Sequence, residues 1–259
     1  NYNRSYRGMQ IAGFSNYTHT STSGLQLSGL LNYSRLSKGV QISGLANFTK
    51  TNATGLQLSG LFNYASTMKG AQIAGFFNKT THMNGVQIGL VNIADSINGV
   101  GIGLINFYRN GYHKLGLSYN ETNMINLNYK SGNERLYSII NVGLNPVERS
   151  RTYCGGLGLG ADINIYKEKW LFAPEVLQQV FFAAPGQETG HLTRLQCLIK
   201  YRAAKNCAIL FGPALSSAYS LDASWASTML PQELYHRSKT FHIDSWPVWL
   251  GWTLGMEIF

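Results

Sequence analysis

The amino-acid sequence predicts an all-β fold, namely a transmembrane antiparallel β-barrel of about 14–16 strands. A nine-residue phrase, Gly-apolar-Gln-Ile/Leu-small-Gly-Leu/Phe-any-Asn, occurs five times from Gly8 onward and twice more in a shortened form. The 259 residues include 28 glycines, 15 tyrosines and 12 phenylalanines, whereas only 13% of the chain is charged. No apolar run approaches the ~18 residues that a membrane helix needs, so strands are expected instead of helices.

The repeats cover residues 8–110, and each has the length of one strand with its turn. Their first glycines are Gly8, Gly24, Gly39, Gly55, Gly70, Gly85 and Gly99. A tilted transmembrane strand needs about 9–11 residues, which leaves room for a short connection. Thr-rich links such as THTSTS alternate with links that end in lysine, such as SRLSK. The full period is therefore two units, which favours a series of antiparallel hairpins with alternate ends on opposite sides.

Each unit alternates between apolar and polar residues, as expected for a strand with one lipid face and one lumen face. In the second unit Leu25, Leu27, Leu31 and Tyr33 share one face, and Gln26, Ser28, Leu30 and Asn32 share the other. The predicted lumen-lining residues are the repeated amides Gln10, Gln26, Gln41, Gln57, Gln72, Gln87, Asn16, Asn32, Asn47, Asn63, Asn78, Asn92 and Asn106. The predicted aromatic girdle is Tyr17, Tyr33, Phe48, Tyr64 and Phe107.

The last two units, from Gly85 and Gly99, lack the small residue before the second glycine. A shift of one residue moves every later side chain of a strand to the other face. Either the first five strands contain a β-bulge, or the last two change their facing. A bulge would place Leu and Asn in stacked columns, which is also the pattern of a parallel β-solenoid. The alternative fold is therefore a solenoid over residues 8–110 followed by an eight-stranded barrel.

The rest of the chain continues without a linker, so a single barrel over residues 1–259 is expected. Residues 111–220 contain segments of mixed alternation about as long as membrane strands, residues 221–246 form a long loop, and residues 247–259 form a closing strand. In that strand Trp249, Thr253 and Glu257 alternate against Leu250, Trp252 and Leu254. Seven repeat strands and eight later ones, with residues 1–7 as a remnant of another, give the even number usual for bacterial barrels.

The closing strand, with Trp252 and the terminal Phe259, resembles the sorting signal of Gram-negative outer-membrane barrels. Together with the Gly-x-Gln-Ile-x-Gly-Leu-x-Asn units, the chain resembles a Gram-negative surface-repeat outer-membrane β-barrel family. The resemblance implies a bacterial outer-membrane location, with outer-membrane lipid and lipopolysaccharide around the barrel and the barrel-assembly machinery as a partner during insertion. It implies little about activity.

Charge and composition indicate few specific ligands. The net charge of +9 comes from dispersed Lys and Arg without a basic helix, which argues against nucleic acid and favours anionic lipid headgroups. Cys154, Cys197 and Cys207 form no metal or disulfide pattern; Cys197 and Cys207 are close enough in sequence to meet on adjacent strands, but free thiols are favoured. No residues with the spacing of metal ligands occur, and no cofactor is expected.

Three functions remain from the sequence. The favoured one is a non-enzymatic outer-membrane barrel that acts as an accessory or scaffold subunit of a complex with other envelope proteins. The second is a diffusion pore for small polar solutes, although the inward positions Phe14, Leu30, Leu45, Leu61 and Phe76 would narrow it. The third is an enzyme that modifies lipid A, a hydrolase or transferase, with His236, His242, Asp244 and Ser245 as candidate catalytic residues in one loop. A solvated polar loop is the favoured explanation of those four residues.

Overall fold

The computed structural model describes residues 1–123, 125–145, 152–183, 187–219, 242–243 and 246–258. The chain forms two compact units. The first consists of Asn1–Tyr112 with Ser131–Leu136, and the second of His113–Lys130 with Tyr137–Phe259. The all-β prediction is confirmed: every regular element of the described residues is a strand.

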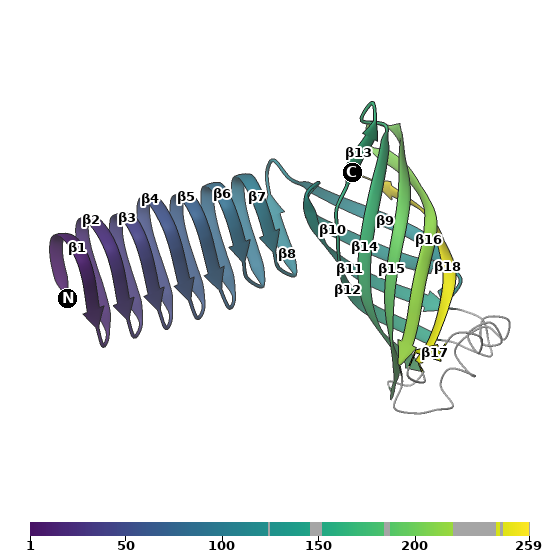
Figure 1. Cartoon of the computed structure of the whole chain (residues 1–259), viewed down its shortest axis with the longest axis horizontal. Helices are drawn as coiled ribbons and strands as arrows, with labels where there is room; N and C mark the ends of the chain where they lie inside the picture. The colour runs from purple at the N-terminus through teal and green to yellow at the C-terminus, as the bar shows by residue number, and fades with distance from the viewer. Residues whose placement is uncertain (124, 146–151, 184–186, 220–241, 244–245, 259) are drawn as a thin grey trace. The chain divides into compact units, whose positions relative to one another are not determined.

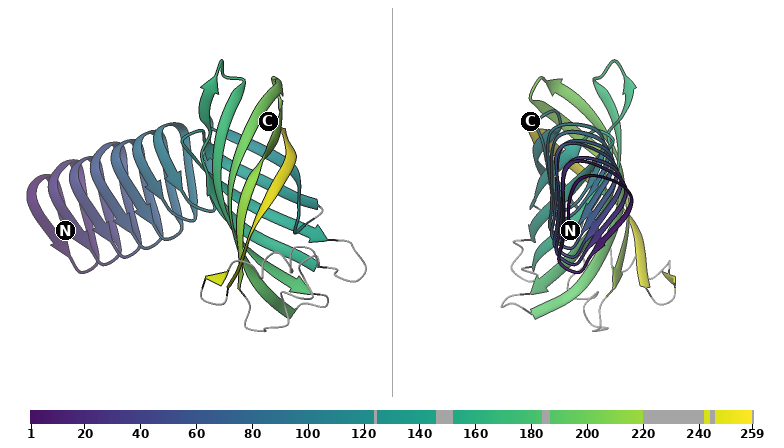
Figure 2. Two further views of the ribbon diagram at one scale, coloured as in Figure 1. Left: turned by 45° about the vertical axis from the view of Figure 1, so that its right-hand side comes forward. Right: turned by 90° about the vertical axis from the view of Figure 1, so that its left-hand side faces the viewer.

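The first unit is a parallel β-solenoid in which each repeat forms one coil (Figure 1). Each strand pairs in parallel with the next, in the order β1-β2-β3-β4-β5-β6-β7-β8. When the solenoid is viewed nearly end-on, the coils appear as flattened loops stacked on one another (Figure 2). The strands are β1 (Tyr2–Ala12), β2 (Ser15–Ser28), β3 (Leu31–Ser43), β4 (Ala46–Ser59), β5 (Phe62–Ala74), β6 (Phe77–Ile88), β7 (Val91–Ile102) and β8 (Ile105–Tyr108).

Two ladders of amide side chains run through the interior of the coils, beside a buried apolar cluster that includes Met68 and Met83. The parallel register places Gln26 beside Gln41 and Asn32 beside Asn47. Gln41 Nε2 donates to Gln26 Oε1 at 2.7 Å, and Asn32 Nδ2 donates to Asn47 Oδ1 at 3.0 Å. The donors of the Gln ladder thus point to the preceding coil, and those of the Asn ladder to the following coil. An amide carries both a donor and an acceptor, so identical amides one strand spacing apart satisfy each other.

Glycine is required at two corners of the inner coils. At the first corner Gly55 has a φ of 115°, and an added Cβ would lie 2.1 Å from Gly39 O. At the second corner a Cβ on Gly44 would lie 2.2 Å from Gly29 O. Real Cβ atoms do not approach a backbone oxygen so closely, since interiors are already close-packed. The two glycines of the repeat therefore permit close stacking of the coils.

The shortened copies keep the same facing because the missing residue is absorbed at the second corner. Ala74, the last residue of β5, has no counterpart in β6, which ends at Ile88. After the Gly-Leu corner the Asn ladder resumes, with Asn78 Nδ2 donating to Asn92 Oδ1 at 2.9 Å. Neither a bulge nor a reversed strand is needed, because the break between strands resets which side chains face inward.

The prediction that the repeats form antiparallel hairpins in a 14–16-stranded barrel is corrected. All seven pairings among β1–β8 are parallel, so the alternative architecture describes residues 8–110. The two-unit period has another cause. The residue before the first corner is Arg7, Lys38 and Lys69 in alternate coils and Ser23, Thr54 and Asn84 in the coils between. In-register stacking would otherwise place like charges about 4.8 Å apart, which is unfavourable.

The second unit is a closed antiparallel barrel of eight strands (Figure 1). Around the wall the order is β12-β11-β10-β9-β18-β16-β15-β14, and β12 pairs with β14 to close it. The short strands β13 (Ile163–Tyr166) and β17 (His242–Ile243) pair with β14 and β18. The wall strands are β9 (Tyr112–Asn120), β10 (Ile125–Asn133), β11 (Leu136–Asn145), β12 (Thr152–Gly160), β14 (Trp170–Ala183), β15 (Gln187–Ala204), β16 (Cys207–Tyr219) and β18 (Trp246–Ile258). The strands expected over residues 111–220 and 247–259 are present.

Candidate functional site

The outer surface of the barrel is apolar on every wall strand, and the buried charged residues of the barrel lie on the inner surface, beside a small apolar cluster of Ala173, Leu198 and Leu210. In β18 the side chains of Leu250, Leu254 and Ile258 are 76%, 47% and 53% exposed, whereas Thr253 and Glu257 are buried. This is the alternation predicted for the closing strand. Apolar residues with the same orientation are Leu115, Leu117, Leu127, Val142, Leu157, Leu195, Ile209, Phe211 and Leu215. Soluble monomers rarely expose a continuous apolar surface, so an apolar exterior on every wall strand indicates contact with lipid or with other proteins.

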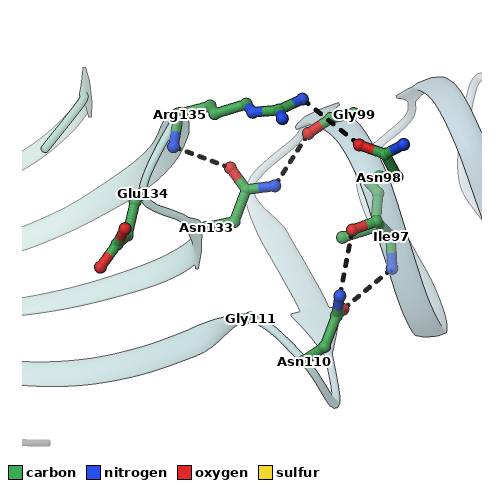
Figure 3. A pocket seen from close by; sticks show the side chains of 8 residues that line it. All are labelled: Ile97, Asn98, Gly99, Asn110, Gly111, Asn133, Glu134 and Arg135. Atoms are coloured by element: carbon green, nitrogen blue, oxygen red, sulfur yellow. Dashed lines mark hydrogen bonds between the residues drawn. The ribbon is translucent and has the colours of Figure 1, made fainter. Parts of the chain in front are cut away.

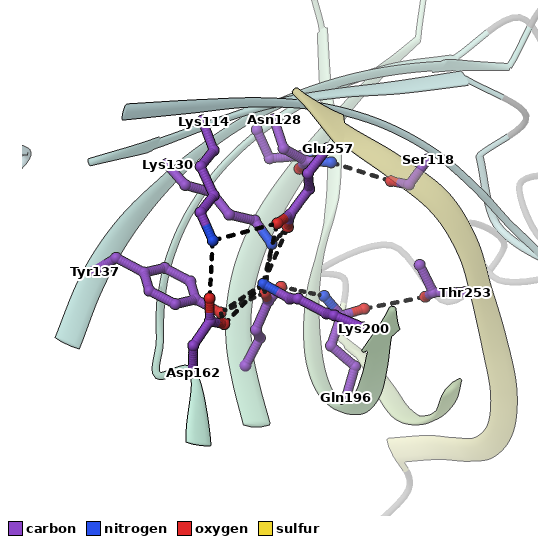
Figure 4. A network of polar contacts seen from close by, with 12 residues as sticks. Lys114, Ser118, Asn128, Lys130, Tyr137, Asp162, Gln196, Lys200, Thr253 and Glu257 are labelled. Carbon is purple, nitrogen blue, oxygen red and sulfur yellow. Dashed lines mark hydrogen bonds and ion pairs between the residues drawn. The ribbon is translucent and has the colours of Figure 1, made fainter. Parts of the chain in front are cut away.

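Three lysines and three carboxylates meet inside the barrel (Figure 4). Lys200 Nζ lies 2.9 Å from Asp162 Oδ1 and 3.1 Å from Glu257 Oε1. Lys114 Nζ lies 2.9 Å from Asp162 Oδ2. Lys130 Nζ bridges Glu257 Oε1, at 2.5 Å, and Glu175 Oε1. Every charge therefore has a partner, which a buried ion requires in order to stay ionised without a large desolvation cost.

Neutral groups complete this network. The Tyr137 hydroxyl donates to Glu175 Oε1 at 2.7 Å, and Gln196 Nε2 donates to Glu175 Oε2 at 2.8 Å. The Tyr137 ring also lies beneath two ammonium groups, 5.0 Å from Lys200 Nζ and 5.3 Å from Lys130 Nζ. A Cβ on Gly160 would lie 2.5 Å from that ring. Gly160, the last residue of the glycine-rich segment GLGLG at 156–160, therefore makes room for Tyr137.

A second ion pair lies elsewhere in the barrel interior. The Arg194 guanidinium forms two contacts with Glu121, Nη1 to Oε1 at 2.5 Å and Nη2 to Oε2 at 2.9 Å. Arg194 Nη2 also donates to Thr253 Oγ1 at 3.1 Å, and Trp252 N donates to Glu121 Oε2 at 2.9 Å. The bidentate geometry is the strong form of the Arg–carboxylate interaction. This pair connects Glu121, which follows β9, with both β15 and β18.

The interior around this network is packed, as expected for eight strands, whose barrel is just wide enough to be filled by side chains. Beside Lys130, Glu175 and Glu257 lies a space of about 10 Å³, which holds about one water molecule. The arrangement suits a rigid, charge-balanced filling.

These charged residues were not identified from the sequence as an interior network, although the alternation of the strands contains a signal for it. In LTRLQCLIKYR the polar residues Arg194, Gln196 and Lys200 share one parity, and Leu195, Ile199 and Tyr201 share the other. When charged residues recur on one face of a strand whose other face is apolar, the charged face is expected to point into the barrel and to pair there with residues of opposite charge. The partner itself cannot be found from sequence, because Lys130 and Glu257 are 127 residues apart.

The last coil of the first unit is covered by Ser131–Leu136, where an open hollow of about 340 Å³ occurs (Figure 3). Asn110 Oδ1 accepts from Ile97 N at 2.9 Å, and its Nδ2 donates to Ile97 O at 3.0 Å. Asn133 Nδ2 donates to Gly99 O at 2.9 Å. These amides satisfy the strand edge of β7, so the residues around the hollow act first as a cap of the stack.

The predicted lumen-lining amides are interior residues, but of the solenoid and not of a barrel lumen. Gln26, Gln41, Asn32 and Asn47 are each fully buried. The predicted aromatic girdle is also corrected. Tyr17, Tyr33, Phe48 and Tyr64 are consecutive in one column on the outer surface of the coils, and Lys79 and Ile93 separate them from Phe107. Tyr17 and Tyr33 stack at 4.7 Å. A column along parallel coils is not a ring around a barrel end.

The prediction that Phe14, Leu30, Leu45, Leu61 and Phe76 face inward is wrong. Phe14 is 69% exposed and Phe76 is 46% exposed, because these residues form the outer side of the second corner. Of the candidate catalytic residues, His236, Asp244 and Ser245 lie outside the described residues, as does Phe259, and His242 belongs to β17. Most of the predicted loop over 221–246 also lies outside them. Cys154, Cys197 and Cys207 are free thiols, as favoured.

Among the described residues, no group of three His, Cys, Asp or Glu side chains has an arrangement that would hold a metal ion. The described residues also contain no helix long and apolar enough to cross a membrane. Comparison of the chain with family models, with curated proteins and with solved structures gives no match.

Proposed function

We propose that this protein is an integral outer-membrane protein whose barrel is a closed anchor, and that it serves as a non-enzymatic accessory or scaffold subunit of an envelope complex. The observation that carries the proposal is the combination of an apolar exterior with a filled, charge-balanced interior. Only closed barrels and helices satisfy all backbone hydrogen bonds in lipid, and this barrel closes through β12 and β14.

The scaffold role follows from what the barrel carries. Conduction requires a continuous polar path, whereas Lys114, Lys130 and Lys200 occupy the interior together with their carboxylate partners. The solenoid provides a long surface of stacked coils, and such surfaces commonly bind partners. Other envelope proteins are therefore the expected partners, with the barrel-assembly machinery acting during insertion.

Two measurements test this function. Purified full-length protein in planar bilayers is expected to give no steady single-channel current, because the described part of the interior is occupied by the lysine–carboxylate network. Extraction from outer membranes in a mild detergent is expected to recover stable partner proteins. Steady currents from the pure protein would replace the scaffold by the pore for small polar solutes.

The lipid A-modifying enzyme has a separate test. Lipid A from cells with the wild-type protein is compared with lipid A from cells with His242→Ala. Identical lipid A profiles are expected under the scaffold proposal. A wild-type-specific modification that disappears in the variant would overturn it.

A further inference from the structure

One side of the outer surface of the solenoid is apolar in every coil, although these side chains are not part of the interior. Most interior positions are Gln, Asn, Ser or Thr, together with one buried apolar cluster of Ala53, Ala65, Met68, Met83, Ala94, Ile97 and Tyr108, whereas the repeated Leu and Phe and most of the Ile lie outside. Three adjacent apolar columns follow the first corner: Met9, Leu25, Val40, Leu56, Ala71, Val86 and Val100; Ile11, Leu27, Ile42, Leu58, Ile73, Ile88 and Ile102; and Phe14, Leu30, Leu45, Leu61, Phe76, Leu90 and Leu104.

The apolar surface continues beyond the second corner. Leu31, Ala46, Phe62, Phe77, Val91 and Ile105 form the next column, followed by the aromatic column of Tyr17, Tyr33, Phe48 and Tyr64. Leu45, Leu61 and Leu90 at the corner are about 40% exposed in the middle of the stack (39%, 42% and 43%). The longest columns contain seven residues, so at about 4.8 Å per strand the apolar surface extends for roughly 29 Å. Single exposed apolar residues are common on soluble proteins, whereas a continuous surface of this length indicates a binding site.

Cations lie at both sides of the apolar surface. Before the first corner stand Arg7, Lys38 and Lys69, one in every second coil. Beyond the aromatic column stand Arg35 and Lys50. Residues 1–112 contain eight Lys or Arg, all exposed, and a single acidic residue, Asp95. An apolar strip with cations on either side is the pattern of elements that rest in the interface of an anionic membrane.

We propose that the solenoid binds the surface of an anionic lipid bilayer, with the Gly-Leu/Phe corner and its neighbouring columns inserted at the headgroup boundary and the flanking Lys and Arg on lipid phosphates. Charge complementarity selects this occupant over a second copy of the solenoid, since two such surfaces would bring their cations together. The proposal rests on the membrane location proposed above, and it adds a second lipid contact that is independent of the barrel.

The test uses full-length protein in vesicles, with Cys197→Ala and Cys207→Ala to remove the accessible thiols. A polarity-sensitive fluorophore is attached to a cysteine at one of three positions: Leu61→Cys on the apolar corner, Asn52→Cys on the polar side of the coil, or Ile209→Cys on the barrel exterior. Vesicles contain phosphatidylcholine alone or mixed with phosphatidylglycerol. Quenching by a spin label on the lipid chain is compared with quenching by aqueous iodide.

The Leu61 probe is expected to shift to the blue and to be quenched by the lipid label in vesicles with phosphatidylglycerol, whereas the Asn52 probe stays accessible to iodide. Arg7→Glu, Lys38→Glu and Lys69→Glu together should abolish the effect at Leu61. The same reversal at Lys167, Lys169 and Lys205, exposed cations of the second unit, should leave it unchanged.

Each remaining outcome has a defined meaning. If the Ile209 probe is quenched by the lipid label and the Leu61 probe by iodide, the barrel spans the membrane and the solenoid proposal is overturned. A Leu61 probe shielded from both quenchers means that protein covers the surface, which also overturns it. An Ile209 probe accessible to iodide contradicts the membrane location itself.

Discussion

The solenoid and the barrel both enclose polar side chains, but they use different chemistry because their strands run differently. In the parallel coils identical residues lie side by side, as Gln41 beside Gln57. Charges in such columns would repel, whereas amides pair with their own kind. In the antiparallel barrel unlike residues meet, so Lys130 reaches Glu175 and Glu257. Strand direction thus decides whether a polar interior is built from neutral ladders or from ion pairs.

The largest expected effect is the loss of one barrel cation. Lys200→Met leaves Asp162, Glu175 and Glu257 with two lysines, and breaking a buried pair costs about 3–5 kcal/mol. The loss of stability is measured by urea unfolding in detergent, monitored by tryptophan fluorescence. This signal reports on the second unit, because all tryptophans lie outside the repeats. Adding Glu257→Gln leaves the pairs Lys114–Asp162 and Lys130–Glu175 and should restore part of the stability. Exposed Lys205→Met should change little; an equal loss there would contradict the role of the network.

A corner glycine of the solenoid comes next. Gly44→Ala places a Cβ 2.2 Å from Gly29 O, and forced overpacking costs about 3 kcal/mol where backbone cannot move. Hydrogen exchange over residues 1–112, read by mass spectrometry, should show faster exchange in the neighbouring coils. Gly13→Ala is the matched control, because it occupies the same corner with nothing within 4 Å of the new Cβ. Equal exchange in the two variants would show that close stacking does not require the glycine.

A smaller effect is expected within the amide ladder. Gln57→Leu removes the acceptor of Gln72 Nε2 and the donor to Gln41 Oε1, and each unsatisfied buried group costs about 1–3 kcal/mol. Gln87→Leu at the ladder end should cost less, because it breaks a single ladder bond, to Gln72 Oε1. Local hydrogen-exchange rates over the solenoid are compared between the Gln57→Leu and Gln87→Leu variants. A greater loss at Gln87 would mean that the ladder bonds do not set the stability.

The smallest effect is expected at Tyr108, whose hydroxyl occupies the space above Gly101, where the ladder would place another Gln. Within the described residues this buried hydroxyl has no hydrogen-bond partner. Tyr108→Phe should therefore change stability at neutral pH by less than about 1 kcal/mol. Burial raises the pKa of Tyr108, so the folded state holds this proton more tightly than the unfolded state. Stability should fall as pH rises above about 10 in the wild type, and this part of the fall should vanish in the variant.

How far the sequence predicts the structure also differs between the two units. The strands, the repeat boundaries, and the burial of Gln26 and Asn32 follow from period-two alternation. The direction of the strands does not follow from this pattern. The alternation of Lys38 with Thr54 fits antiparallel hairpins, and it fits equally well a parallel stack in which neighbouring coils avoid like charges. The side chains of Leu45 and Leu61 were predicted to face inward but face outward. The two-residue break after each strand resets the alternation, so it cannot be continued across the corner. In the barrel the closing strand was predicted well, but the pairing of Lys200 with Asp162 depends on closure, which no local pattern encodes.

The opposite polarity of the two ladders has a consequence for the growth of the stack. Each Gln amide donates toward the preceding coil and each Asn amide toward the following one. The dipoles of the two columns therefore oppose each other along the solenoid axis, unlike the aligned peptide dipoles of a helix. Adding a coil lengthens both columns and leaves their sum nearly unchanged, so a long array accumulates no large end charge. The number of coils is then free to vary by duplication or loss of repeats, most readily in pairs that preserve the alternating cations.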